Sequence, residues 1–300
     1  IRHFLDIDCL DENILKDIVS QAMELKASKS KTFPSTLGKT LALIFEKPST
    51  RTRVSFEVGM LQLGGNVVIL NDKETQLSRG ETVADTSRLL SRYADIIMLR
   101  TDKHKRLNEL AANASVPVIN GLTDNTHPCQ IMADILTFQE HRGNIENKTV
   151  AWVGDGNNVA TSWLHASTKF GFKLRIATPK SLEIDKTIIL EARNKGGQVE
   201  VFNDPFAAVT DADCVLTDTW LSMGAKQDNS QVENLLKPFQ VNSKMMKTAK
   251  ANAVFMHCLP AHRGEEVTAE VIDGPQSLVW EEAENRLHVQ KAIILWCLGK

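Results

Sequence analysis

The sequence has no strong excess of charge of either sign and no long hydrophobic run. Its 300 residues carry 35 Lys and Arg against 37 Asp and Glu, a net charge of -2. Because surface binding of nucleic acid usually needs a basic field, we expect no nucleic-acid partner and only local anion binding. The apolar run 293–298 is far shorter than the ~20 residues that span a bilayer. The N-terminus has no apolar segment long enough for a signal peptide, so we expect no membrane association.

Cysteine is scarce and poorly spaced for cross-linking. The five cysteines are Cys9, Cys129, Cys214, Cys258 and Cys297. The number is odd and no C-x-x-C pair occurs, which argues against both a disulfide framework and a zinc knuckle. We therefore expect a reduced, cytoplasmic protein.

What the sequence does contain is an alternation of short apolar runs and helix-period segments. In the first half the expected strands are residues 41–45, 67–70, 95–99 and 116–119, and the expected helices are 53–63, 82–93, 105–114 and 128–141. The runs are almost entirely apolar, as strands must be when a parallel sheet is covered on both faces.

A polar stretch at residues 142–148 interrupts this alternation, and we place a domain boundary there. The pattern then restarts, with expected strands at 150–153, 174–177, 199–202, 214–217 and 253–256, and expected helices at 159–170, 186–194 and 284–298. We predict an α/β protein of two domains, each an open, mostly parallel sheet flanked by helices. From its own pattern, the last helix could pack on either domain.

The first polar motif follows the first strand and reads Ser49-Thr50-Arg51-Thr52-Arg53. Hydroxyl groups and free N–H groups at a helix start bind anions, and arginine forks match phosphate oxygens. An ordinary capped surface helix would explain one hydroxyl but not this combination at a strand end. The motif favours a phosphate site, to which both arginines could contribute.

Two further motifs end strands of the first domain. Arg100 ends one strand, and His127-Pro128-Cys129-Gln130 opens the long helix after another. Without a metal, His127 and Gln130 could polarise a carbonyl oxygen. Two alternatives remain open: Cys129 could act as a thiol nucleophile, or the segment could only cap and pack the helix.

In the second half, Gly154-Asp155-Gly156-Asn157-Asn158 follows a strand and resembles the start of a dinucleotide-binding loop. However, residue 159 is valine where that motif has glycine or alanine, and the next strand ends without the acid that binds ribose. The amides of Asn157 and Asn158 could instead hold a polar substrate.

The last two motifs also follow strands. Asp218 precedes Ser222-Met223-Gly224, and its carboxylate suits an ammonium group; alone it could equally cap a helix. Cys258 lies in His257-Cys258-Leu259-Pro260 at the end of another strand, where it could face a ligand or simply pack.

Taken together and in this order, the motifs resemble those of the carbamoyltransferase family over essentially the whole chain. The resemblance implies that a first domain, 1–142 plus 286–300, binds carbamoyl phosphate and that a second, 147–285, binds an amino acid. It implies that the terminal helix returns to the first domain. It also implies a homotrimer with active sites at subunit interfaces.

The resemblance assigns roles residue by residue. It implies a carbamoyl phosphate site made of Ser49, Thr50, Arg51, Thr52, Gln76, Arg100, His127, Pro128, Cys129, Gln130, Cys258, Leu259 and Arg286. It implies an acceptor site made of Asn158, Asp218, Ser222 and Met223. The catalytic group among these would be Arg100, His127, Asp218 and Cys258. Gln76 resembles the position that reaches into a neighbouring subunit's site.

The acceptor follows from the sign of one charge. The aspartate-using branch of the family typically has H-P-L-P where this chain has H-C-L-P, and it needs cations for a second carboxylate. Asp218 instead suits a cationic amino acid, so the resemblance implies carbamoyl transfer to the side-chain amine of L-ornithine, in arginine metabolism. This chemistry requires no cofactor, neither metal nor nucleotide, and no covalent enzyme intermediate. The rival functions are an NAD-dependent dehydrogenase and an inactive relative that only binds ligands.

Overall fold

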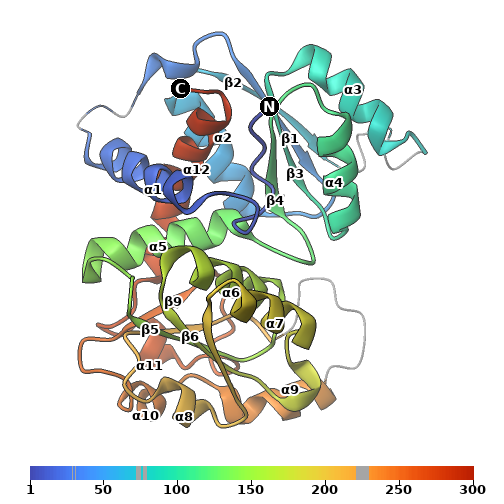
Figure 1. The fold of residues 1–300 in the computed structure, drawn as a ribbon. Coiled ribbons are helices and arrows are strands. Elements are labelled where there is room, and N and C mark those ends of the chain that lie inside the picture. Colours follow the sequence, from blue (N-terminus) through green and yellow to red (C-terminus); the bar gives the residue numbers. More distant parts are fainter. Residues whose placement is uncertain (29, 31, 72–75, 77–79, 221–229) are drawn as a thin grey trace. The chain divides into compact units, whose positions relative to one another are not determined.

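The computed structural model describes residues 1–28, 30, 32–71, 76, 80–220 and 230–300 (Figure 1). These residues form two compact units, Ile1–Leu136 with Glu284–Lys300, and Thr137–Ala283. Each unit contains one parallel sheet flanked by helices, which confirms the predicted fold class.

The first unit is built on a four-stranded sheet in the order β2-β1-β3-β4. Its strands are β1 (Thr40–Phe45), β2 (Asn66–Asn71), β3 (Ile96–Arg100) and β4 (Val118–Leu122). Its helical segments are α1 (Glu12–Ala27), η1 (Pro34–Thr36), α2 (Thr50–Gln62), α3 (Val83–Tyr93), α4 (His104–Asn113) and the start of α5 (Pro128–Arg142). All of β3 and nearly all of β1 are buried, which explains why these strands read as unbroken apolar runs.

The C-terminal helix α12 (Val279–Cys297) begins before residue 284, where the sequence pattern predicted its start. From Glu284 onward it belongs to the first unit. There Lys291 donates to the Oε1 atom of Gln62 at 3.0 Å, and a Cβ atom at Gly59 would lie 3.3 Å from the Lys291 side chain. The return of this helix to the first domain is thereby confirmed.

The second unit is built on a five-stranded sheet in the order β7-β6-β5-β8-β9. Its strands are β5 (Thr149–Val153), β6 (Lys173–Ala177), β7 (Gln198–Phe202), β8 (Cys214–Thr217) and β9 (Val254–His257). Its helical segments are α6 (Asn158–Phe170), η4 (Lys180–Leu182), α7 (Lys186–Asn194), α8 (Pro205–Val209), α9 (Ser230–Leu236), η5 (Lys237–Phe239), α10 (Ser243–Met246) and α11 (Ala269–Ile272).

Both sheets reverse their strand order at one place. In the first unit β1 lies between β2 and β3, and in the second unit β5 lies between β6 and β8. Open parallel sheets bind ligands beyond the carboxyl ends of their strands at such reversals. The residues that follow β1 and β3, and those that follow β5 and β8, are therefore the first candidates for two binding regions.

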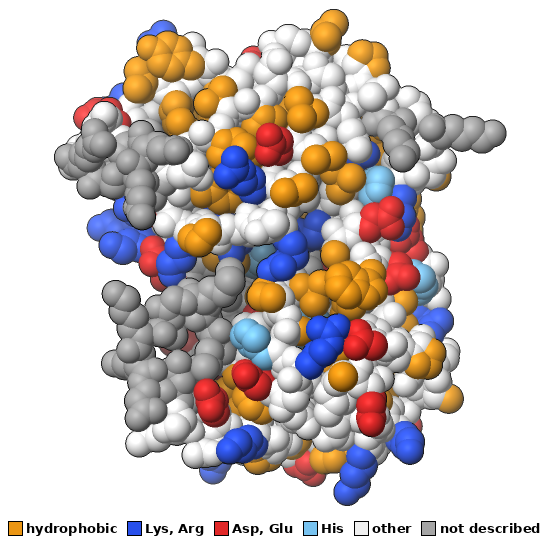
Figure 2. Space-filling model, turned by 180° about the vertical axis from the view of Figure 1, so that it is seen from behind, with side chains coloured by type: hydrophobic (Ala, Val, Ile, Leu, Met, Phe, Trp, Pro, Cys, Tyr) orange, Lys and Arg blue, Asp and Glu red, His pale blue; other side chains and the backbone are white. Residues whose placement is uncertain are grey.

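The surface carries charges of both signs. On the face drawn in Figure 2, Lys and Arg side chains are interspersed with Asp and Glu rather than gathered in one region. Among the residues described, no helix is both long and apolar enough to cross a membrane. Because the net charge is -2, attraction for an anion depends on local groups of residues rather than on an overall basic field.

Candidate active site

The start of α2 forms an anion-binding turn directly after β1. Ser49 is the N-cap, with extended backbone (φ -159°, ψ 109°), and its side chain accepts a hydrogen bond from the N–H of Thr52 at 3.3 Å. The N–H groups of the first helical turn lack partners within the helix and carry the positive end of its dipole. The motif that was predicted to bind phosphate therefore has the backbone geometry of an anion site.

Two buried arginines converge on this turn. Arg100, at the end of β3, donates to the Oγ1 atom of Thr52 at 3.2 Å, and Arg286 of α12 donates to the same oxygen at 3.2 Å. Arg286 also donates to the Oε1 atom of Gln130 at 2.6 Å. The exposed fractions of Arg100 and Arg286 are only 9% and 3%. The structure thus brings together four residues that are far apart in the sequence and that the resemblance assigned to one site.

His127, the residue before α5, is buried beside these arginines. Its pKa is lowered well below the ordinary value, first by burial and then by the positive charges of Arg286, Arg100 and Arg51. The imidazole is therefore neutral at neutral pH and can donate one N–H group to a carbonyl oxygen. The same three arginines generate the local positive potential that a phosphate needs.

Cys129 lies in the first turn of α5, next to Pro128, and the surroundings of its thiol do not favour a role as nucleophile. The thiol is fully buried and donates to the carbonyl oxygen of Asn120 at 3.3 Å. Burial raises the pKa of the thiol to about 12. Because the thiolate is the reactive form, this geometry argues against Cys129 as a nucleophile.

Gln76, the predicted inter-subunit residue, takes part in none of these contacts. Gln76 is exposed, and its carbonyl oxygen accepts from the N–H of Glu81 at 3.0 Å. Ser222 and Met223 lie outside the described residues.

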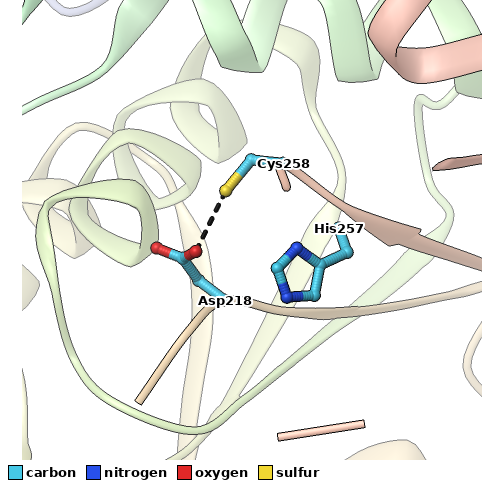
Figure 3. A group of neighbouring side chains, drawn as sticks. All are labelled: Asp218, His257 and Cys258. Atoms are coloured by element: carbon cyan, nitrogen blue, oxygen red, sulfur yellow. Dashed lines mark hydrogen bonds between the residues drawn. The ribbon is translucent and has the colours of Figure 1, made fainter. Parts of the chain in front are cut away.

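In the second unit Asp218 follows β8 and is the centre of a polar cluster (Figure 3). Its Oδ1 atom accepts from the Sγ atom of Cys258 at 3.0 Å and from the N–H of Thr219 at 2.8 Å. Its Oδ2 atom accepts from the Nδ2 atom of Asn157 at 2.8 Å. The carboxylate is therefore fixed in orientation by three donors at the carboxyl ends of neighbouring strands.

Asn157 was named beside Asn158 as a possible substrate ligand, but the resemblance assigned only Asn158 to the acceptor site. Asn157 caps α6: its Oδ1 atom accepts from the N–H groups of Val159 and Ala160 at 2.9 and 3.1 Å, while its Nδ2 atom holds Asp218. Asn158 is already the first helical residue. An asparagine ahead of a predicted helix signals a cap, but its second bond depends on β5 lying next to β8, which the sequence does not show.

The two glycines of this loop serve the chain's own packing. Gly154 has φ +132°, a conformation that side chains strongly disfavour. A Cβ atom at Gly156 would lie 2.4 Å from the carbonyl oxygen of Leu182. The similarity of this loop to a dinucleotide-binding motif therefore has a structural cause that involves no nucleotide.

Between these glycines lies a second carboxylate, Asp155. Its pKa is raised to about 6, first by burial and then by the charge of Asp218, although a hydrogen bond from the backbone of Gly156 opposes the shift. Two acidic groups that repel each other make this region favourable for a cation.

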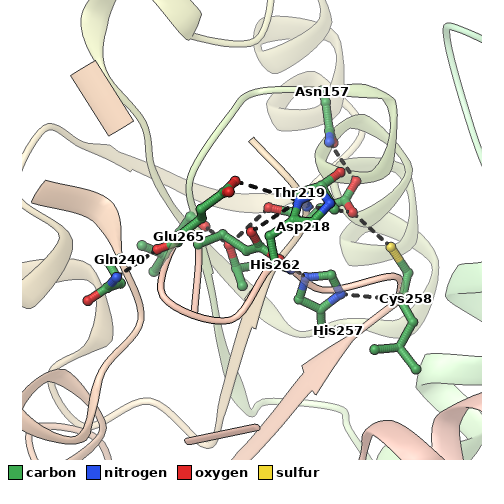
Figure 4. Close-up of polar contacts among 12 residues, drawn as sticks. Asn157, Asp218, Thr219, Gln240, His257, Cys258, His262 and Glu265 are labelled. Atoms are coloured by element: carbon green, nitrogen blue, oxygen red, sulfur yellow. Dashed lines mark hydrogen bonds and ion pairs between the residues drawn. The ribbon is translucent and has the colours of Figure 1, made fainter. Parts of the chain in front are cut away.

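His257 anchors the loop that carries Cys258 (Figure 4). The Nδ1 atom of this buried histidine accepts from the N–H of Leu259 at 2.9 Å, and its Nε2 atom bonds the Oε1 atom of Glu266 at 2.9 Å. Leu259 has φ +56°, a strained value for a residue with a side chain. Donor atoms of Asp218, His257 and Cys258 lie within 4.8 Å of one another, but both nitrogens of His257 already have partners, so these residues make a poor metal site.

Comparison with known protein families matches both halves of the chain. The carbamoyl-P binding domain of aspartate/ornithine carbamoyltransferases matches residues 2–140, and the Asp/Orn binding domain of the same enzymes matches residues 146–297. The chain belongs to the aspartate/ornithine carbamoyltransferase family.

Members of this family resemble the chain over nearly their full length. Ornithine carbamoyltransferases from Nitrobacter winogradskyi and Rhodopseudomonas palustris are 56% and 58% identical to it, and each alignment covers 99% of this chain and 97% of the relative. The solved structure of the ornithine carbamoyltransferase from Pyrococcus furiosus is 49% identical, with a TM-score of 0.95, and the match covers 99% of this chain and 97% of that one. In this carbamoyltransferase, the residues after β1 and β3 fall in the half matched by the carbamoyl-P binding domain, and Asp218 falls in the other half.

Proposed function

We propose that the chain transfers the carbamoyl group of carbamoyl phosphate to the side-chain amine of L-ornithine and releases L-citrulline and phosphate. The observation that carries this choice of acceptor is Asp218, a carboxylate held by Asn157 and Cys258 with Asp155 nearby. A cluster of negative charge suits the ammonium group of ornithine and would repel the second carboxylate of aspartate. Family membership and the names of the relatives support the same reaction.

The first unit supplies the donor half of the reaction. Carbamoyl phosphate carries about two negative charges at neutral pH. Arg51, Arg100 and Arg286 offset these charges, and the N–H groups at the start of α2 bind the phosphate oxygens. Neutral His127 donates to the carbonyl oxygen while that oxygen gains negative charge, with Gln130 beside it. The proposed ligands of carbamoyl phosphate are Ser49, Thr50, Arg51, Thr52, Gln76, Arg100, His127, Pro128, Cys129, Gln130, Cys258, Leu259 and Arg286.

The second unit supplies the acceptor half. Asn158, Asp218, Ser222 and Met223 are the proposed ligands of ornithine. The δ-ammonium group releases one proton to solvent, and Asp218 and Cys258 orient the neutral amine for attack. The amine nitrogen then bonds to the carbonyl carbon, the bond from that carbon to the phosphate oxygen breaks, and a phosphate oxygen accepts the remaining proton. Binding both substrates in one geometry supplies much of the rate.

We also propose an organisation for the active protein. Residues 1–142 with 286–300 form the carbamoyl phosphate domain, and residues 147–285 form the ornithine domain. The enzyme assembles as a homotrimer whose active sites lie at subunit interfaces, where Gln76 reaches a neighbouring subunit. The exposed apolar side chains of Val54 and Leu61 on α2 are suited to such contacts. No disulfide joins the five cysteines, all of which the structure describes, and this suits the reducing cytoplasm.

One assay tests the proposal against its rivals. Purified protein is given carbamoyl phosphate with ornithine, aspartate or putrescine, and citrulline and phosphate are measured. We expect turnover with ornithine only. Phosphate release with aspartate but not ornithine would refute the assignment of the acceptor. No product with any acceptor, together with intact ligand binding, would favour a protein that only binds.

A pair of arginine variants tests the donor half. Arg51→Ala should abolish binding of carbamoyl phosphate, because it removes a guanidinium beside His127 and the start of α2. Arg53→Ala is the matched control, since Arg53 lies two residues further along α2 and is exposed. Calorimetric titration with carbamoyl phosphate should give wild-type affinity for Arg53→Ala and none for Arg51→Ala. Equal affinities in the two variants would contradict the proposed phosphate site.

A further inference from the structure

Hydrogen bonds fix the backbone of the loop after β9, which carries one imidazole and two carboxyl side chains (Figure 4). The Nε2 atom of Gln240 donates to the carbonyl oxygens of Gly264 and Glu265, both at 2.8 Å. The N–H of Gly264 donates to the carbonyl oxygen of Val267 at 2.8 Å, and Gly264 itself has φ +92°. These bonds fix the backbone that presents His262, Glu265 and Glu266, so their arrangement is formed before any ligand arrives.

Glu266 is a buried acid with one oxygen satisfied and one not. Its side chain is 0% exposed. Its Oε1 atom accepts from the Nε2 atom of His257 at 2.9 Å and from the N–H of His262 at 2.7 Å. Its Oε2 atom is buried, has no hydrogen-bond partner among the described residues, and lies 3.9 Å from the Nδ1 atom of His262. A buried carboxylate oxygen without a donor lowers the stability of the fold, so a cation bound to this atom would be stabilising.

The geometry around this oxygen fits a metal ion. The Nδ1 atom of His262 lies 3.6 Å from the Oε2 atom of Glu265 and 3.9 Å from that of Glu266, and donor atoms of the three side chains lie within 4.8 Å of one another. A tetrahedral ion with bonds of about 2.0–2.2 Å holds its ligands about 3.3–3.6 Å apart. We propose that His262, Glu265 and Glu266 bind a divalent transition metal ion of the zinc class.

The chemistry of the three ligands selects the kind of ion. Imidazole with carboxylates suits zinc and its neighbours, whereas magnesium and calcium prefer sites made of oxygen alone. The side chains of His262 and Glu265 are 47% and 48% exposed, which leaves access for the ion and for a water as fourth ligand. The oxygen of Glu266 opposite the ion is held by His257, a pattern that orients metal ligands in proteins.

The alternative is that a protonated His262 merely forms two ion pairs with these carboxylates. A measurement of zinc binding distinguishes the proposed metal site from such a pair of ion pairs. Equilibrium dialysis against ZnCl2 should show one bound ion per chain, and MgCl2 should not compete with it. Because the thiol of Cys258 could also bind zinc, the measurement is made in a Cys258→Ser background. No turnover is involved, so the result does not depend on the proposed function.

Variants of the two exposed ligands locate the ion without disturbing buried Glu266. His262→Ala and Glu265→Gln should each weaken zinc binding at least about tenfold. The matched controls are His141→Ala and Glu191→Gln, an exposed pair from α5 and α7. Crystals soaked in ZnCl2 should give an anomalous peak bonded to His262 and both glutamates. Binding that survives in both ligand variants, or the absence of a peak at these three residues, would overturn the proposal.

Discussion

Replacement of Asn157 by serine separates the two functions of this side chain, which are to cap α6 and to bind Asp218. In the structure its Oδ1 atom caps α6 and its Nδ2 atom donates to Asp218 at 2.8 Å. Serine caps a helix about as well as asparagine but is too short to reach Asp218. We therefore expect Asn157→Ser to keep the contribution of the helix cap to stability within about 0.5 kcal/mol while it frees the carboxylate that binds ornithine.

The expected loss of activity can be derived from the lost bond. A hydrogen bond to a charged group contributes about 1.5–3 kcal/mol, and the lower value applies here because Asn157 is partly exposed. A loss of about 1.4 kcal/mol corresponds to about a tenfold lower kcat/KM for ornithine. The KM for carbamoyl phosphate should not change, because its proposed charged ligands lie in the other unit. Asn157→Ala should show the same kinetic loss and, in addition, a stability lower by about 1 kcal/mol.

Initial rates of citrulline formation at saturating carbamoyl phosphate, with ornithine varied, give the kinetic result, and urea unfolding gives the stability. The control is Asn242→Ala, which removes the cap of α10 through Met245 and should lower stability without a change in kcat/KM. If Asn157→Ser has wild-type kinetics while Asn157→Ala does not, the effect comes from helix capping. The role assigned to the bond between Asn157 and Asp218 would then be wrong.

Three further outcomes follow from burial and charge. Iodoacetamide should alkylate exposed Cys9 readily and leave Cys129 unmodified in the folded protein, because the thiol of Cys129 is buried with a pKa of about 12. Peptide mass spectrometry measures the labelling, and rapid labelling of Cys129 would refute this expectation. Gly156→Ala should lower the urea midpoint by the equivalent of about 1–3 kcal/mol, because its Cβ would overlap the backbone of Leu182, and an unchanged midpoint would show that the loop can move. The raised pKa of Asp155, about 6, means that its charged form destabilises the fold above that pH, whereas below about pH 4 the group is protonated in both the folded and unfolded states. Asp155→Asn should therefore raise the free energy of unfolding by up to about 3 kcal/mol at neutral pH, with no gain near pH 4; an equal gain at both pH values would exclude titration as the cause.

The sheets could be predicted because burial on both faces leaves a simple signal. Each predicted strand overlaps an observed one, and for β4 the bounds differ most, since apolar residues 116–119 lie partly before the strand Val118–Leu122. Helix α1 was missed although its signal is present. Asp11 caps it, and Leu15, Ile18, Val19 and Ala22 recur at the spacing of a buried helical face. The short helices α8 to α11 have too few turns to show a period.

From the sequence, the candidate site could be predicted only as a set of polar residues that follow the strands. Polar residues that follow apolar runs can be read directly from the sequence, and this rule found Arg100, Asp218 and Cys258. What the sequence does not contain is the order of the strands. The bond between Asn157 and Asp218 requires β5 to lie beside β8, although β6 and β7 intervene in the chain.

The contacts of the Thr52 hydroxyl in the first unit also depend on an arrangement of elements that the sequence does not contain. Thr52 accepts from Arg100, 48 residues away, and from Arg286, 234 residues away. The first contact exists because β1 and β3 are neighbours although β2 separates them in the sequence. The second exists because α12 returns to the first unit after the whole second unit has been completed. At each reversal of strand order the connections leave in opposite directions, so the carboxyl ends of the two central strands stay uncovered by either connection. Residues from distant parts of the chain can therefore meet there, and the strand order places the polar groups of both units beside such a reversal.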